Sequence, residues 1–228
     1  QLAAAFNRMS ADLKRQDGER AEILAGISHD LRTPLARLRL EAELSIADDA
    51  ARQAVAEDIA RMDAIIAQFL NFARGGAGEA VEMTDLDALV ADLAEAYTRS
   101  GHPLTLTLSG TALPLRRQGM QRALGNLIDN ACKYGEKEIS VATWHSSGEV
   151  GIDVLDRGPG IPATEIEHLK RPFTRLESAR SNACGTGLGL AIAERMARLH
   201  GGHLDLLPRP GGGLIARLRL PRPPAPLQ

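Results

Sequence analysis

The sequence predicts two folded parts in series, an all-α hairpin followed by an α+β sandwich in which helices cover one sheet. Up to about residue 74, apolar side chains recur every three or four residues, which is the period of an amphipathic helix. Gly75-Gly76-Ala77-Gly78 then has the composition of a linker. Beyond it, runs with a period of two alternate with helical runs, as expected where helices pack on a sheet.

The N-terminal part reads as two helices. The first runs to about residue 47, and its apolar stripe consists of Leu24, Ile27, Leu31, Leu35 and Leu38. A turn at residues 47–50 precedes a second helix, whose apolar positions are Val55, Ile59, Met62, Ile66, Phe69 and Phe72. Two helices cannot bury both stripes between themselves. We therefore expect an antiparallel hairpin that pairs with a second copy of the chain as a four-helix bundle.

The octet Ser28-His29-Asp30-Leu31-Arg32-Thr33-Pro34-Leu35 lies in the first helix. His29 falls off the apolar stripe, so we expect its imidazole to face solvent beside Asp30 and one helical turn from Thr33. A lone histidine next to an acid is most often an ordinary surface pair. Pro34 favours a functional interpretation, because a proline inside a helix costs roughly 3 kcal/mol and frees the carbonyl of Asp30, which predicts a kink at this site.

The second part contains runs with the helical period of three to four residues and runs with the period of two that is typical of strands. Its expected helices cover residues 85–99, capped by Thr84 or Asp85, then 120–134 and 188–199. Its expected strands cover residues 104–108, 113–115, 139–143, 150–155, 203–207 and 214–220. A turn at 146–148 joins the third and fourth of these strands, and a proline-rich tail begins at 221.

Three motifs in this part carry residues suited to a nucleotide. Asn126 and Asn130 share one helix face, and their neutral oxygens suit a hard cation such as Mg²⁺. Asp156-Arg157-Gly158-Pro159-Gly160 follows a strand, where the carboxylate can accept from an exocyclic amine while glycines let the backbone approach a ring. Gly185-Thr186-Gly187-Leu188-Gly189-Leu190 opens a helix whose N–H groups favour phosphate. Each motif alone is equally an ordinary polar face, turn or loop, so the inference depends on their joint order.

Together the motifs resemble those of sensor histidine kinases of two-component systems, especially the EnvZ-like ones. The octet is similar to the family's H box, the Asn126–Asn130 helix to its N box, and the two glycine runs to its glycine boxes, in the family's order. The resemblance implies a GHKL ATP-binding fold, with residues 161–186 as a mobile lid. Arg171-Pro172-Phe173-Thr174-Arg175 matches the family's Phe-containing box. Lys170 departs from the pattern, because relatives often carry an aromatic or aliphatic residue there.

The resemblance also implies a role for each matched residue. His29 is the expected phosphoryl acceptor, Asp30 its partner, and Thr33 the residue that positions a water for a phosphatase step. Asn130, supported by Asn126, is expected to bind Mg²⁺. The remaining residues expected to bind ATP are Lys133, Tyr134, Asp156, Gly158, Gly160, Arg175, Gly185, Thr186, Gly187, Leu188 and Gly189.

The implied protein is a homodimer that autophosphorylates His29 with ATP and transfers the group to an aspartate in the receiver domain of a response regulator. Its expected divisions are a HAMP-like signalling lead-in (1–21), a dimerisation and phosphotransfer domain (22–74), a linker (75–81), a catalytic ATP-binding domain (82–221) and a tail (222–228).

Composition constrains the setting of the protein. The formal net charge is −2 and no basic block is present, which argues against a nucleic-acid partner. No apolar run approaches the roughly 20 residues that span a bilayer, and the chain has no signal peptide and no initiator Met. We therefore expect the cytoplasmic fragment of a bacterial inner-membrane protein, joined to the membrane only through a missing N-terminal part.

The two cysteines, Cys132 and Cys184, suit a reducing compartment. A disulfide between them that pins the lid is the weaker hypothesis, and it requires both to line the nucleotide cleft.

Two other functions compete with this interpretation. A gyrase-like, chaperone-like or mismatch-repair ATPase shares the ATP motifs and uses hydrolysis to drive a clamp, but the His29 octet argues against it. A non-enzymatic dimeric scaffold with a degenerate pocket is the second alternative, and the presence of Asn130, Asp156 and Gly187 argues against that. An acid-labile phosphohistidine separates the kinase from the first alternative, and direct ATP binding separates it from the second.

Overall fold

The computed structural model describes residues 26–27, 30–74, 79–135, 138–176 and 186–222. The chain divides into two compact units, residues 1–77 and 78–228. Within the described ranges, no helix combines the length and apolar content needed to cross a bilayer.

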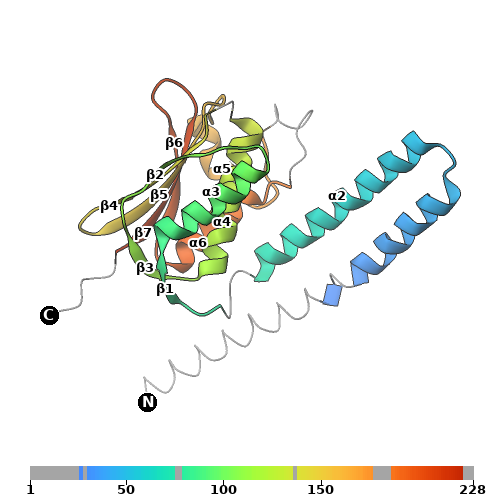
Figure 1. The fold of residues 1–228 in the computed structure, drawn as a ribbon, viewed down its shortest axis with the longest axis horizontal. Helices are drawn as coiled ribbons and strands as arrows, with labels where there is room; N and C mark the ends of the chain where they lie inside the picture. The colour runs from blue at the N-terminus through green and yellow to red at the C-terminus, as the bar shows by residue number, and fades with distance from the viewer. Residues whose placement is uncertain (1–25, 28–29, 75–78, 136–137, 177–185, 223–228) are drawn as a thin grey trace, which may run out of the picture. The chain divides into compact units, whose positions relative to one another are not determined.

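The first unit is a helical hairpin (Figure 1). Helical backbone covers residues 26–27 and 30–45, residues 46–48 form the turn, and α2 runs over Asp49–Arg74. The two predicted helices and the turn between them are therefore confirmed. The helix continues through Pro34, while the predicted orientation of His29 lies outside the described residues.

Polar contacts hold the two arms of the hairpin together. Arg52 donates from Nη1 to the carbonyl of Ile46 at 3.3 Å, and its Nε lies 3.4 Å from Glu43 Oε2, which closes the turn. Farther along, Arg32 Nε lies 3.0 Å from Asp63 Oδ1 across the hairpin. Side chains at this pair are half exposed, so each pair contributes only about 0–1 kcal/mol. Polar contacts therefore align the arms, and burial of the stripe has to supply most of the stability.

The apolar stripe of the first helix stays open in the single chain. Ile27, Leu31 and Leu38 are 45%, 44% and 51% exposed. Of the described apolar side chains in this unit, those that are buried are Ala42, Ile59 and Leu70. This is the outcome expected when two helices cannot cover both of their stripes.

The second unit contains a five-stranded sheet in the order β2-β4-β5-β7-β6 and a two-stranded sheet, β1-β3. β2 runs parallel to β4, and the other neighbouring strands are antiparallel. The strands are β1 (Glu82–Asp85), β2 (Thr105–Thr107), β3 (Ala112–Leu115), β4 (Ser140–His145), β5 (Glu149–Leu155), β6 (His203–Pro208) and β7 (Leu214–Pro221).

Helices α3 (Leu86–Arg99), α4 (Arg117–Tyr134) and α6 (Gly189–Leu199) lie along one face of the five-stranded sheet (Figure 1). Asp85 caps α3, because its Oδ1 accepts from the N–H groups of the second and third helical residues at 3.0 and 3.1 Å. The predicted α+β sandwich is confirmed, with the core between this helix layer and the sheet.

Along β5, side chains point alternately into that core and away from it. Val150, Ile152 and Val154 point into it and are at most 2% exposed. The residues between them lie on the face away from the helices, where Asp153 is also buried. A buried carboxylate requires hydrogen-bond donors, and the neighbouring strands provide them.

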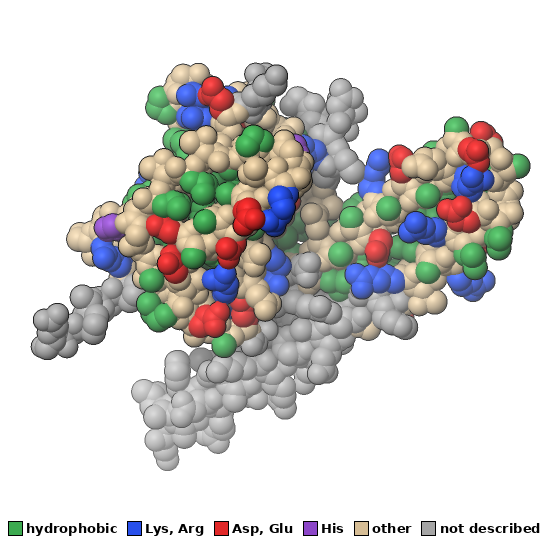
Figure 2. Space-filling view, in the orientation of Figure 1, with side chains coloured by type: hydrophobic (Ala, Val, Ile, Leu, Met, Phe, Trp, Pro, Cys, Tyr) green, Lys and Arg blue, Asp and Glu red, His purple; other side chains and the backbone are tan. Residues whose placement is uncertain are grey.

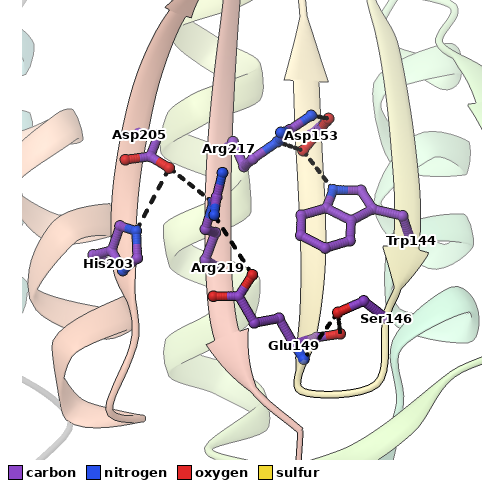
Figure 3. Close-up of polar contacts among 8 residues, drawn as sticks. All are labelled: Trp144, Ser146, Glu149, Asp153, His203, Asp205, Arg217 and Arg219. Atoms are coloured by element: carbon purple, nitrogen blue, oxygen red, sulfur yellow. Dashed lines mark hydrogen bonds and ion pairs between the residues drawn. The ribbon is translucent and has the colours of Figure 1, made fainter.

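Figure 3 shows those donors on the outer face of the sheet. Arg217 donates from Nε and Nη2 to the two oxygens of Asp153 at 2.8 and 2.6 Å, and Trp144 Nε1 donates to Oδ1 at 2.9 Å. Gly151 leaves room for the indole, because a Cβ there would lie 2.0 Å from the ring. The row continues with the ion-paired side chains of Glu149, His203, Asp205 and Arg219. Charged side chains with partners within the sheet thus cover this face.

Two elements differ from the sequence prediction. β1 was not predicted, because Thr84 is its only buried side chain and the strand has no apolar alternation. Part of the predicted mobile lid is folded, since residues 163–165 form a 3₁₀ turn (η1) and Ile166–Leu169 form α5. Leu169 is buried and fixes this part of the lid.

Candidate nucleotide site

The site begins where α4 crosses the start of α6. Asn126 and Asn130 flank Gly189, where an added Cβ would lie 3.3 Å from Asn126 Oδ1 and 3.4 Å from Asn130 Nδ2. Asn126 Nδ2 donates to the carbonyl of Arg122 at 2.8 Å. Within the described chain, the amide of Asn130 takes part in no hydrogen bond and is available to a ligand. The two predicted motifs, about 60 residues apart, are thus brought into contact.

Asp156 follows β5 and is 8% exposed. Its Oδ1 accepts from the N–H of Gly158 at 2.8 Å and from the N–H of Leu214 at 3.2 Å. Oδ2 accepts nothing from the part of the chain that the structure describes. A carboxylate fixed through one oxygen with the other open is suited to accept from an amine such as that of adenine.

The glycines around Asp156 permit close packing that a side chain would prevent. A Cβ at Gly158 would lie 2.3 Å from the carbonyl oxygen of Tyr134, at the end of α4. A Cβ at Gly213 would lie 2.1 Å from the carbonyl oxygen of Asp156. Gly160 has a φ of +73°, which favours glycine. The Asp156 loop therefore packs closely against both the end of α4 and the turn before β7.

The N-terminus of α6 provides donors for an anion. Leu188, at the cap position of this helix, is fully buried and has no side-chain capping bond. The N–H of Leu188 donates to Thr186 Oγ1 at a long 3.4 Å. The remaining N–H groups of the first turn carry the positive end of the helix dipole. Such a terminus favours phosphate or another anion.

Gly187 joins the glycine loop to the lid. Its φ is +71°, its carbonyl accepts from the N–H of Phe173 at 3.0 Å, and a Cβ there would lie 2.6 Å from the carbonyl oxygen of Thr174. Phe173 is itself at a φ of +63° and is 57% exposed. A non-glycine residue in this region costs about 1–3 kcal/mol and is typical of ligand clamps.

The lid residue that departs from the family pattern has its own partner. Lys170 Nζ lies 2.8 Å from Glu167 Oε1, one turn earlier in α5. The hydrogen bond from Lys170 lowers the pKa of Glu167. This ion pair keeps the ammonium out of the core, so the lysine is accommodated beside the buried Leu169.

The structure gives less detail for the remaining predicted site residues. Lys133 Nζ lies 5.3 Å from the centroid of the Tyr134 ring, and both side chains are exposed at the end of α4. Arg175 is half-buried beyond Phe173. On the hairpin, Asp30 and Thr33 are exposed on a helix, while His29 and Gly185 lie outside the described residues.

Cys132 does not line this cleft, so that expectation is wrong. Two residues after Asn130, it lies about 200° around α4 from that asparagine and packs against the hydrophobic core, where burial and the nearby Asp129 raise the pKa of its thiol. On the same side Tyr97 donates to Asp129, and burial raises the pKa of Tyr97 well above its usual range. Cys184 lies outside the described residues, and the position of Cys132 argues against a disulfide that pins the lid.

The support that Asp156 receives from β7 and Arg209 was not predicted from the sequence. The N–H of Leu214 holds its carboxylate, and Arg209 Nη1 donates to its carbonyl oxygen at 2.9 Å. The available signal was the run Gly211-Gly212-Gly213, because three consecutive glycines between two strands suggest a close approach of backbones. All three have positive φ values.

We predict that Gly187→Ala weakens ATP binding. The substitution forces an L side chain into a left-handed conformation, at a cost of about 1–2 kcal/mol, and drives Cβ into the lid backbone. Gly125→Ala is the matched control, because its Cβ would meet only Tyr97 Oη at 3.8 Å. Thermal unfolding and ATP titration compare the two variants. Equal ATP affinity in both would show that the Gly187–lid contact is unimportant for binding.

The sandwich, the asparagine pair, the buried aspartate and the uncapped helix together define a GHKL-type nucleotide-binding domain. Residues 116–224 match the family described as histidine kinase-, DNA gyrase B-, and HSP90-like ATPase. Residues 19–78 match the His Kinase A (phospho-acceptor) domain.

Individual proteins and solved structures also match the chain, two of them over more than 90% of its length. The chain is 36% identical over 223 residues to the sensor histidine kinase GtrS of Pseudomonas aeruginosa, covering 97% of the chain and 46% of that relative. It is 34% identical to the solved histidine kinase domain of the Escherichia coli osmosensor EnvZ, covering 65% of the chain and 93% of that domain with a TM-score of 0.51. The crystal structure of full-length ShkA shares the fold, with a TM-score of 0.70 at 22% identity over 91% of the chain and 48% of ShkA.

The chain belongs to the sensor histidine kinases. It spans about half the length of the curated relatives that it matches.

Proposed function

We propose that this chain is the kinase core of a two-component sensor, which phosphorylates itself on His29 and passes the phosphoryl group to an aspartate of a response regulator. The observation that carries the proposal is the cradle of Asp156, Asn130 and the open α6 terminus, in a chain that also carries the His29 octet. Transfer of label from the γ-phosphate of ATP to the protein tests it, and an unlabelled protein would contradict it.

ATP is the ligand of this cradle, which consists of Asp156, Asn130 and the N-terminus of α6. Asp156 Oδ2 accepts from the adenine amine, and the backbone at Gly158 and Gly160 makes room for the ring. Tyr134 lies beside the base or ribose, and Lys133 neutralises phosphate charge. The α6 terminus from Gly185 to Gly189, with Thr186, Gly187 and Leu188, binds phosphate oxygens. Arg175 makes a further phosphate contact. The bound ATP analogue AMPPNP in the ShkA crystal structure supports ATP as the ligand of this fold.

The asparagines fit a magnesium ion. They are neutral amides at the phosphate end of the cradle, and the Asn130 amide has no hydrogen bond within the described chain. Asn130 would hold the ion, with support from Asn126. When bound, the ion would supply positive charge that stabilises the phosphates during transfer.

The reaction is an in-line attack by a ring nitrogen of His29 on the γ-phosphorus of ATP. A nitrogen–phosphorus bond forms, the bond from the γ-phosphorus to the bridging oxygen breaks, and ADP leaves. An imidazole has a pKa near 6.5, so the neutral nucleophile is well populated at neutral pH. Asp30 accepts from the other ring N–H and stabilises the positive charge that develops on the ring.

The hairpin acts as a homodimer. Its exposed apolar stripe, which includes Ile27, Leu31 and Leu38, is covered by a second copy in a four-helix bundle. The response regulator docks on the hairpin near His29. Figure 2 shows acidic and basic side chains interspersed on the face in view, which suits a protein partner better than nucleic acid.

The domain bounds and the setting form part of the same proposal. Residues 22–74 are the dimerisation and phosphotransfer domain, 82–221 the catalytic domain, and 1–21 the end of a HAMP-like lead-in. The kinase core works in the cytoplasm of a bacterium, joined to the inner membrane through a part that precedes it.

The chain is also a phosphatase toward its regulator, with Thr33 positioning the attacking water. We predict that Thr33→Ala lowers this activity by about tenfold or more, while autophosphorylation stays within about twofold of the native rate. Thr33→Ser keeps the hydroxyl and is the matched control. The phosphatase rate is measured with a phosphorylated regulator, and the autophosphorylation rate is measured with ATP. A kinase rate that falls together with the phosphatase rate would mean that Thr33 is structural.

A further inference from the structure

The turn between β6 and β7 packs against Asp156. It covers residues 209–213, and the N–H of Arg209 donates to the carbonyl of Gly213 at 3.0 Å, which closes the turn. The next residue, Leu214, exchanges two hydrogen bonds with Asp156. Its N–H donates to Asp156 Oδ1 at 3.2 Å, and its carbonyl accepts from the N–H of Asp156 at 3.0 Å. The orientation of the Asp156 carboxylate therefore depends on where this turn holds Leu214.

The glycines of this turn give it little stiffness of its own. Gly211, Gly212 and Gly213 have φ values of +80°, +98° and +105°. Because glycine loses more conformational freedom on folding than any other residue, such a run keeps one conformation only where other groups hold it. A side chain cannot replace the last glycine, since a Cβ at Gly213 would lie 2.1 Å from the carbonyl oxygen of Asp156. The turn therefore depends on bonds from side chains outside the glycine run.

Two arginines supply those bonds, in opposite directions. Arg209 Nη1, at the start of the turn, donates to the carbonyl of Asp156 at 2.9 Å. Arg157 Nη1, next to Asp156 in sequence, donates to the carbonyls of Pro210 and Gly212 at 2.9 and 3.3 Å. The turn and the Asp156 loop are thus joined by reciprocal bonds from a guanidinium group to a backbone carbonyl.

Glu138, just before β4, lies beside both guanidinium groups. Its Oε2 is 3.6 Å from Arg157 Nε, and its carbonyl accepts from Arg209 Nη1 at a long 3.5 Å. The side chain of Glu138 is 75% exposed, so the ion pair with Arg157 contributes little. Of the two arginines, Arg209 is the one whose side chain bonds to Asp156 itself, whereas the side chain of Arg157 bonds to the turn.

We propose that Arg209 is a positioning residue for recognition of the adenine amine, which keeps Oδ2 of Asp156 aimed at the exocyclic nitrogen of ATP. The proposal rests on the proposed function, in which Asp156 accepts from that amine. Arg209 acts through the backbone of Asp156 and of the turn. Its loss is therefore expected to weaken the contact with the amine and to leave the contacts with the triphosphate intact.

The test measures the affinities of ATP and of purine riboside triphosphate, in which a hydrogen atom replaces the amine. The ratio of the two affinities isolates the contact with the amine, because the ribose and the triphosphate are the same in both nucleotides. The variant is Arg209→Ala. Arg222→Ala is the matched control, because Arg222 Nη1 also donates to a backbone carbonyl, that of Ser146 at 3.0 Å, at the other end of β7. The melting temperature is measured for each protein.

We expect the native chain and Arg222→Ala to bind ATP about tenfold or more tightly than the analogue, because the analogue lacks a hydrogen bond to a charged group. In Arg209→Ala we expect this preference to fall by about fivefold or more, since a carboxylate that is free to turn keeps only part of that bond. The fall comes from weaker binding of ATP, with the affinity for the analogue unchanged.

The proposal is overturned if Arg209→Ala keeps the native preference for ATP. It is also overturned if Arg209→Ala loses affinity for both nucleotides by the same factor, since that describes a purely structural role. Arg209→Met, which keeps an unbranched apolar stem and removes the donors, is judged by the same criteria if Arg209→Ala does not fold. A native chain that binds both nucleotides equally would overturn the proposal together with the role of Asp156, and one that binds neither would contradict the proposed nucleotide site.

Discussion

Replacing His29 with glutamine is expected to abolish phosphorylation of the chain while leaving ATP binding at the native level. Glutamine keeps the side chain polar but has no imidazole nitrogen to attack phosphorus. His29 belongs to the unit of residues 1–77, whereas the ATP cradle is built within residues 78–228, so the two activities separate physically.

The control for this substitution is His102→Gln, because His102 is an exposed histidine of the second unit. Phosphate incorporation is measured with γ-labelled ATP, and affinity is measured by titration with a non-hydrolysable analogue. Phosphate that still appears on the His29→Gln protein would show that the nucleophile is another residue.

Asn130→Ala should lose most of the magnesium-dependent part of ATP binding. The Asn130 amide has no hydrogen bond within the described residues, so its removal would break no internal hydrogen bond and would delete the proposed oxygen ligand of the magnesium ion. Polar contacts to charged groups contribute about 1.5–3 kcal/mol, which corresponds to about 10- to 150-fold in affinity.

Gln121→Ala provides the matched control on the same helix, where Gln121 is exposed. Titration calorimetry with and without Mg²⁺ separates the two contributions. We expect the native chain and Gln121→Ala to bind ATP more tightly when Mg²⁺ is present, and Asn130→Ala to show little difference. An Asn130→Ala protein with a full magnesium effect would remove Asn130 from the metal site.

The order of elements in the second unit could be predicted because most of them carry a strong apolar period. β4 and β5, for example, lie within one residue or two of the predicted strands. β1 could not be predicted, since its pairing with β3 depends on backbone hydrogen bonds and buries only Thr84. A short edge pairing of this kind leaves no pattern in the side chains.

The motif residues of the candidate site could be predicted from the sequence, but the residues that hold them in place could not. Spacing alone placed Asn126 and Asn130 on one face, and the structure adds that this face meets Gly189. The donors from Leu214 and Arg209 to Asp156 come from across the sheet, about 55 residues away, and no local pattern marks them. Cys132 illustrates the opposite error, because nearness in sequence to Asn130 does not place a helical residue on the same face.

The acceptor at the N-terminus of α4 was missed for a related reason. Glu79 accepts there from the N–H groups of Gln118 and Gly119 at 2.5 and 3.0 Å. An acid after a glycine-rich run reads as a solvated linker residue, and only the tertiary fold brings the N-terminus of α4 to it. Capping by a residue about 40 positions away differs from the local caps that sequence patterns reveal, such as Asp85 at the start of α3.

Incubation of the native chain with Mg²⁺ and γ-labelled ATP, followed by peptide mapping of the label, separates a histidine kinase from an ATPase. We expect one phosphoryl group, labile in acid and stable in base, on the peptide that contains His29. Label released only as inorganic phosphate, with none on the protein, would instead identify a clamp-type ATPase and rule out the kinase function.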